Sequence, residues 1–137
     1  MKKELINKVK NWLSIADDDL KTVYNELKAK EPVTRAICFH AQQCVEKYLK
    51  AYLTFKQKYF RKTHDIEELI FFCLETDNEF EKLRDIKAHE LIKYGVEVRY
   101  PDEFYLPSME EAERAAEIAE KVKDFVLNKL KESGFEP

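Results

Sequence analysis

The sequence contains few residues that break helices: among its 137 residues there are two glycines and four prolines. This scarcity disfavours a turn-rich all-β fold and favours long helices. The three cysteines are an odd number, which is typical of reduced thiols rather than of a disulfide framework. No apolar run approaches the roughly 18 residues of a membrane span, and the start of the sequence lacks the apolar block of a signal peptide. We therefore expect a cytoplasmic protein.

Charge is distributed unevenly, although the net charge is only −3. Residues 1–63 carry 14 basic and 7 acidic side chains, whereas residues 64–137 carry 10 basic and 20 acidic ones. The stretch from Lys47 to Lys62 holds six basic residues, no acidic residue and several interleaved aromatic rings. Such a stretch can attract phosphate and stack on bases. Alternatively, the two halves of one bundle neutralise each other, within the chain or across a dimer.

Hydrophobic periodicity predicts about five helices. The first covers about residues 3–28, and the second covers about 32–58 because Pro32 suits a first helical turn. Thr63 is the predicted N-cap of a third helix, residues 79–94 form a less regular fourth helix, and Ser108 opens the last helix through a capping box. With no repeat and no linker, residues 1–137 are expected to form one domain, an all-α, antiparallel up-and-down helical bundle.

The second helix carries two stripes with steps of three and four residues. The apolar stripe consists of Ile37, Ala41, Cys44, Tyr48, Tyr52 and Phe55. The polar stripe consists of His40, Gln43, Lys47, Lys50 and Thr54. Two stripes on one helix predict that one side packs inward and that the other side meets something polar.

The sequence gives little support for metal or cofactor chemistry. Cys38, His40 and Cys44 diverge around their helix, and the run from Asp17 to Asp19 is expected to form a solvated edge. The sequence has no glycine-rich phosphate loop and no nucleophile in a strand-turn-helix setting, so we predict no metal and no cofactor. Histidine remains as a candidate catalytic residue. An imidazole can transfer a proton while a neighbouring guanidinium binds phosphate, and such a pair can cleave RNA without a metal.

One stretch resembles a family signature. The residues from Phe39 to Ala51, FHAQQCVEKYLKA, are similar to FHAQQxxEKxLKA, the signature of the HEPN (higher eukaryote and prokaryote nucleotide-binding) domain family. Four further marks of that family occur in the expected order, and the resemblance spans about residues 4–130. They are Trp12-Leu13 with Ala16 and Asp19-Leu20, Thr63-His64-Asp65-Ile66 with Leu69, Arg99-Tyr100-Pro101, and Glu111-Ala112 with Ala119.

The resemblance implies a helical bundle that dimerises and that acts in a nucleotide or RNA context. HEPN proteins often occur beside a minimal nucleotidyltransferase, and some such pairs behave as toxin and antitoxin, with a metal-independent ribonuclease as the HEPN partner. Other members bind nucleotides or partner proteins without the nuclease motif. We therefore expect a homodimer that binds a nucleotide or RNA, works with a nucleotidyltransferase partner and makes no contact with a membrane.

The binding interpretation assigns the polar stripe, one histidine and two loop residues to the site. Lys47, Lys50 and Arg99 would contact phosphate, and Tyr100 would stack on a base. The complete predicted set is His40, Gln43, Lys47, Lys50, His64, Arg99 and Tyr100.

Two alternatives remain open at this point. The nuclease branch of the family carries an Arg followed four to six residues later by a His. Arg99 has no His after it, whereas Arg84 and His89, and also Arg35 and His40, fit the bare spacing. A metal-independent endoribonuclease toxin would use Arg84 and His89, the pair in the expected region. The other alternative is a non-catalytic protein-interaction module, and the departure at Arg99 weighs against an enzyme.

Overall fold

The computed structural model describes residues 2–95 and 105–136. Every regular element in these residues is helical, which confirms the predicted all-α class. The elements are α1 (Lys2–Leu27), α2 (Thr34–Phe55), α3 (Ile66–Leu74), the 3-10 helix η1 (Asn78–Phe80), α4 (Glu81–Asp85), a second 3-10 helix η2 (Ala88–Tyr94) and α5 (Met109–Glu132).

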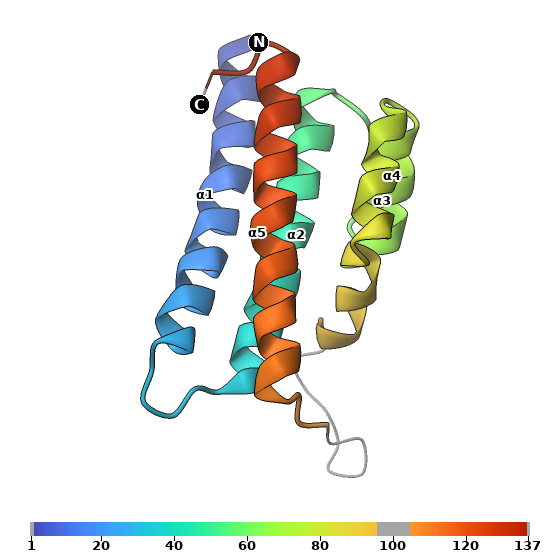
Figure 1. The fold of residues 1–137 in the computed structure, drawn as a ribbon. Helices are drawn as coiled ribbons and strands as arrows, with labels where there is room; N and C mark the ends of the chain where they lie inside the picture. Colours follow the sequence, from blue (N-terminus) through green and yellow to red (C-terminus); the bar gives the residue numbers. More distant parts are fainter. Residues whose placement is uncertain (1, 96–104, 137) are drawn as a thin grey trace.

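The three long helices lie side by side, and the shorter elements α3 and α4 stand on the other side of α2 (Figure 1). Helices α1 and α2 form an antiparallel hairpin, and α5 ends close to where α1 begins, so both ends of the chain lie at the same end of the bundle. Helix α2 packs against α1, α5, α3 and η2. It is therefore the central helix of the bundle.

The buried core follows the predicted helical periodicity. On α1 the buried residues recur at steps of three and four, and on α5 the predicted apolar stripe is buried throughout. The alanines of α5 allow it to approach its neighbours closely. The buried residues are Val9, Leu13, Ala16, Leu20 and Val23 on α1, and Ala112, Ala115, Ala119, Val122, Val126 and Leu130 on the α5 stripe.

Helix α2 is buried on more than its apolar side, which differs from the simple two-sided prediction. The polar side contains fully buried Gln42 and Glu46 as well as Lys50, which is only 6% exposed. The reason is that the segment leading into α3 and the helix α1 both contact this side. The polar stripe therefore packs against other parts of the same chain and is only partly exposed to solvent.

The predicted continuous fourth helix is wrong. Residues 78–94 form η1, α4 and η2 instead, and the backbone of Lys87 has a φ of 65°, in the left-handed region. A non-glycine residue in that conformation interrupts the helical hydrogen-bond ladder, so α4 ends just before it. Within residues 2–95 and 105–136, no helix combines the length and the apolar character that a membrane span requires.

Candidate functional site

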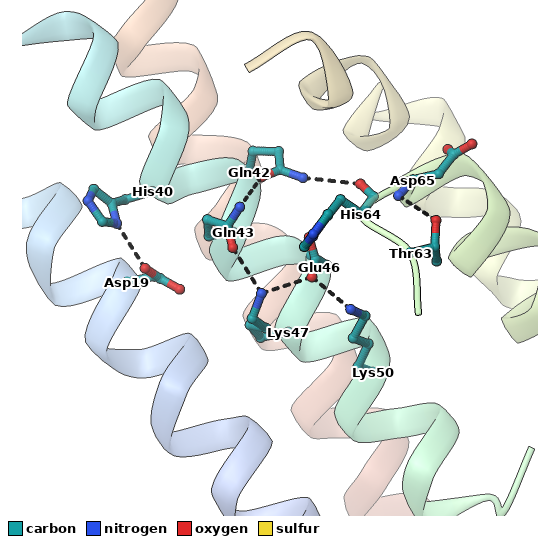
Figure 2. Close-up of polar contacts among 10 residues, drawn as sticks. All are labelled: Asp19, His40, Gln42, Gln43, Glu46, Lys47, Lys50, Thr63, His64 and Asp65. Carbon is teal, nitrogen blue, oxygen red and sulfur yellow. Dashed lines mark hydrogen bonds and ion pairs between the residues drawn. The ribbon is translucent and has the colours of Figure 1, made fainter. Parts of the chain in front are cut away.

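A buried carboxylate, Glu46, lies at the centre of the polar side of α2 (Figure 2). The ammonium groups of Lys47 and Lys50 each lie 2.8 Å from its Oε2, and Nδ1 of His64 lies 2.9 Å from its Oε1. Burial alone would raise the pKa of Glu46, but the hydrogen bonds from Lys47, Lys50 and His64 outweigh burial and hold this pKa below its ordinary value. Glu46 is therefore an ionised carboxylate at neutral pH.

Lys50 is directed inward, which corrects its predicted role as a phosphate contact. Its ammonium group bonds to Glu46 and lies 5.5 Å from the centroid of the Trp12 ring on α1. With its side chain 8% exposed, it is out of direct reach of a ligand on the surface. Lys50 thus links α1 to α2 and balances the charge of Glu46.

A chain of amides connects Lys47 to the segment before α3. Lys47 donates to Oε1 of Gln43 at 2.9 Å, Gln43 donates to Oε1 of Gln42 at 2.9 Å, and Gln42 donates to the carbonyl oxygen of His64 at 3.3 Å. A Cβ atom at Gly95 would lie 3.1 Å from Nε2 of Gln42, so any larger residue there would require the Gln42 amide to shift by a few tenths of an ångström. The amide chain therefore ties α2 to the segment before α3.

A second histidine, His40, pairs with a carboxylate of α1. Its Nδ1 lies 2.8 Å from Oδ1 of Asp19, and the His40 side chain is 32% exposed. Burial raises the pKa of Asp19, and the bond to His40 opposes that shift. The predicted solvated edge from Asp17 to Asp19 is thus wrong for Asp19, whose side chain is 16% exposed, whereas Asp17 is 54% exposed although it accepts from the hydroxyl of Tyr48.

His64 is the most accessible member of the network, with its side chain 74% exposed. It stands just before α3, whose N-cap is Asp65 rather than the predicted Thr63. Oδ1 of Asp65 accepts from the backbone N–H of Glu68 at 3.3 Å, while Oγ1 of Thr63 accepts from the N–H of Asp65 at 3.0 Å. This turn places the imidazole against Glu46.

Figure 2 shows His40, Gln43 and Lys47 along α2 and His64 beside them on the segment before α3, and all four side chains are at least partly exposed. We call His40, Gln43, Lys47 and His64 the signature face. Predictions from the sequence missed its supports, the carboxylates of Asp19 and Glu46. For Glu46 a signal existed, because Glu followed by Lys four residues later is a favourable helical pair. The marks that carried the resemblance in three separate segments, among them Trp12 and Asp19, meet in this network.

Arg84 and His89, the predicted catalytic alternative, share no hydrogen bond in the described structure. Arg84 pairs with Glu67 and, at 3.1 Å, with Glu81. Nε of Arg84 and Nδ1 of His89 are buried and have no hydrogen-bond partner. The guanidinium is therefore held by two carboxylates, those of Glu67 and Glu81.

The predicted loop contacts Arg99 and Tyr100 lie outside the described residues. The described residues on either side of that segment share one partner. The hydroxyls of Tyr94 and Tyr105 both donate to Glu111 in the first turn of α5, and the bond from Tyr105 measures 2.6 Å. Ser108 caps the same turn, as predicted, by accepting from the N–H of Glu111 at 3.0 Å.

A cleft of about 570 Å³ separates η2 from α5. None of the predicted site residues lines it, and its lining combines basic and acidic side chains with apolar ones. The lining residues are Ile86, Lys87, Glu90, Leu91, Lys93, Tyr94, Glu111, Arg114, Ala115, Glu117, Ile118 and Lys121. Among the described residues, no group of three or more His, Cys, Asp or Glu side chains is arranged to hold a metal ion.

Comparison with known proteins tests the resemblance to the HEPN domain family. No curated protein matches the chain. The crystal structure of an archaeal HEPN homologue superposes on it with a TM-score of 0.69 at 24% sequence identity, covering 89% of this chain and 97% of that chain. This likeness shows a shared fold. The family model of the HEPN domain matches residues 9–130, which is most of the chain. The chain therefore belongs to the HEPN domain family.

Proposed function

We propose that this HEPN domain binds the phosphate groups of a nucleotide or RNA on the signature face. The observation that carries the proposal is the alignment of His40, Gln43, Lys47 and His64 along α2, with two of them held by buried Glu46. Lys47 uses two of its three N–H donors within the network, on Gln43 and Glu46, and keeps one. A lysine ammonium beside imidazole and amide donors is suited to phosphate oxygens.

The charges around the face limit where a phosphate can bind. Part of the basic stretch is neutralised within the chain, as one interpretation of the sequence expected: Lys58 pairs with Glu75 at 2.7 Å and Arg61 with Glu68 at 2.6 Å. Lys47 belongs to the same stretch but pairs with a carboxylate that Lys50 and His64 also share. Lys47 is therefore the residue of the basic stretch that lies on the signature face, beside Gln43 and Glu46.

The proposal is tested by fluorescence anisotropy with labelled ATP and with a labelled single-stranded RNA of about ten nucleotides. Lys47→Gln removes one charge-assisted hydrogen bond to phosphate, for which we expect roughly tenfold weaker binding or more. Lys121→Gln, on an exposed lysine of α5 paired with Glu117, is the matched control and should bind like wild type. Equal affinities of wild type and Lys47→Gln would refute the site, and the two probes separate free nucleotide from RNA.

The proposal also includes partners: a second copy of the chain and a nucleotidyltransferase. The family resemblance supports both, and large apolar side chains outside the signature face, such as Ile15 on α1 and Phe71 on α3, are 46% and 52% exposed. Light scattering after gel filtration tests the homodimer. Co-expression with a nucleotidyltransferase encoded beside this gene tests the second partner, and separate elution of the two proteins would remove that partner from the proposal.

A further inference from the structure

The two histidines of the signature face share one geometry. Each bonds through Nδ1 to a carboxylate: His64 to Glu46 at 2.9 Å and His40 to Asp19 at 2.8 Å. Since the ionised carboxylate of Glu46 can only accept, Nδ1 of His64 must carry the proton. In the neutral ring, Nε2 then has a lone pair and no hydrogen. Within the described residues, nothing else bonds to either ring, so Nε2 of His64 is open to solvent.

This tautomer determines in which protonation state His64 can bind a phosphate group. Phosphate oxygens accept hydrogen bonds, and so does the bare Nε2 of the neutral ring, so the two repel. The imidazolium form carries a hydrogen on Nε2 and a positive charge, and it binds phosphate well. Without Glu46, the neutral ring could place its hydrogen on Nε2 and bind phosphate directly. The buried carboxylate denies His64 that option.

Most of the charged groups around the two histidines are paired with one another. The ammonium groups of Lys47 and Lys50 both pair with Glu46, and Asp19 pairs with His40. In the segment before α3 and its first turn, Asp65 caps the helix, Arg61 pairs with Glu68, and Glu67 pairs with Arg84. The titratable and charged groups of these segments are Asp18, Asp19, His40, Glu46, Lys47, Lys50, Arg61, Lys62, His64, Asp65, Glu67 and Glu68.

We propose that Glu46 is the positioning residue of the signature face, and that it couples phosphate binding to the uptake of one proton by His64. The proposal rests on the proposed function, because it concerns the same face. The proton comes from solvent and is added to Nε2, no covalent bond to the ligand forms, and the ligand leaves when the proton is lost. By linkage, affinity for phosphate then rises as pH falls.

The test uses a probe that does not itself titrate in the working range. A labelled oligouridylate of about ten nucleotides with hydroxyl ends contains only phosphodiesters, unlike ATP, whose terminal phosphate titrates near neutral pH. Anisotropy is measured between about pH 6 and pH 8 at constant ionic strength. For wild type we expect affinity to rise about tenfold over this range, as one histidine takes up a proton.

Two variants and one control decide the mechanism. In His64→Gln the amide still donates to Glu46 but takes up no proton, so the profile should be flat and binding weaker at low pH. In Glu46→Gln the amide nitrogen faces Nδ1 of His64, the ring carries its hydrogen on Nε2, and the profile should flatten while affinity near pH 8 is kept or raised. A merely structural role of Glu46 predicts loss of affinity at every pH instead. His89→Gln should reproduce the wild-type profile.

Each outcome separates this proposal from the proposed function. Binding by wild type with a flat profile overturns the proton coupling and leaves phosphate binding in place. A slope retained by His64→Gln overturns the role of His64. Absence of binding by wild type at every pH refutes both proposals. If Glu46→Gln loses its helical circular dichroism, ¹⁵N shifts of the His64 ring in wild type replace it, and a ring protonated on Nε2 in its neutral form overturns the role of Glu46.

Discussion

Two regions of this molecule contain the same kinds of residues and use them differently. In the signature region, three side chains that can carry positive charge converge on Glu46, which is fully buried. In the region of Arg84 and His89, one guanidinium lies between Glu67 and Glu81, which are 44% and 53% exposed. A buried carboxylate fixes the orientation of its partners, whereas exposed carboxylates neutralise a cation without building a site.

The largest difference between the two regions should appear when one carboxylate is removed from each. Glu46→Ala leaves Lys50 buried without its partner, and we expect the free energy of unfolding to fall by about 3–5 kcal/mol. Glu67→Ala removes an exposed partner of Arg84 and should cost no more than about 1 kcal/mol. Urea denaturation followed by circular dichroism measures both. Similar losses in the two variants would show that burial does not distinguish the regions.

Acidification should change the contributions of Glu46 and Asp19 to the stability of the fold in opposite directions. The pKa of Glu46 in the folded protein is lower than its ordinary value of 4.5, so Glu46 stabilises the fold above about pH 4.5 and this stabilisation is lost as pH falls below that value. The pKa of Asp19 is higher in the folded protein than its ordinary 3.8, so protonation of Asp19 favours the folded state on acidification.

Unfolding free energies measured between about pH 3 and pH 6 check these signs. Glu46→Gln should flatten the loss of stability on acidification relative to wild type, and Asp19→Asn should steepen it. The two variants are each other's control because both remove one carboxylate from the same face. If both variants shift the pH dependence in the same direction, the assignment of opposite shifts is refuted.

The cap of α3 gives a smaller effect. Asp65→Ala removes the acceptor for the N–H of Glu68, and we expect a loss of about 1 kcal/mol. Asp65→Asn keeps an acceptor at the cap and should lie within a few tenths of a kcal/mol of wild type. Chemical denaturation measures both variants. Equal losses would show that the charge of Asp65 at the helix start matters more than its side-chain hydrogen bond.

Periodicity predicted the long helices well because their buried stripes repeat every three or four residues over many turns. The apolar stripes of α1 and α5 are examples. It failed at residues 79–94, where a single backbone angle at Lys87 ends α4, and no residue type there signals that angle. The polar stripe of α2 was found, but Lys50 was expected to contact phosphate, because periodicity gives a direction around a helix and cannot show that Trp12 covers that direction.

Candidate site residues were predictable where the chemistry is local and unpredictable where it depends on a distant partner. The spacing of His40, Gln43 and Lys47 along one helix could be read from the sequence. The pairing of His64 with Glu46 joins residues 18 positions apart, and that of His40 with Asp19 joins residues 21 positions apart. Only the packing of the segment before α3 and of α1 against α2 brings these partners together.

We expect the smallest effect, no change in RNA cleavage, from substitutions in the region of Arg84 and His89. A mixed RNA pool incubated in EDTA with wild type, Arg84→Ala or His89→Ala should give the same pattern on a denaturing gel. The reason is that Arg84 is held by Glu67 and Glu81, while no hydrogen bond joins it to His89. Cutting by wild type that is lost in both variants would contradict this expectation, because it would require a rearrangement, such as one across a dimer, that frees Arg84 from both carboxylates.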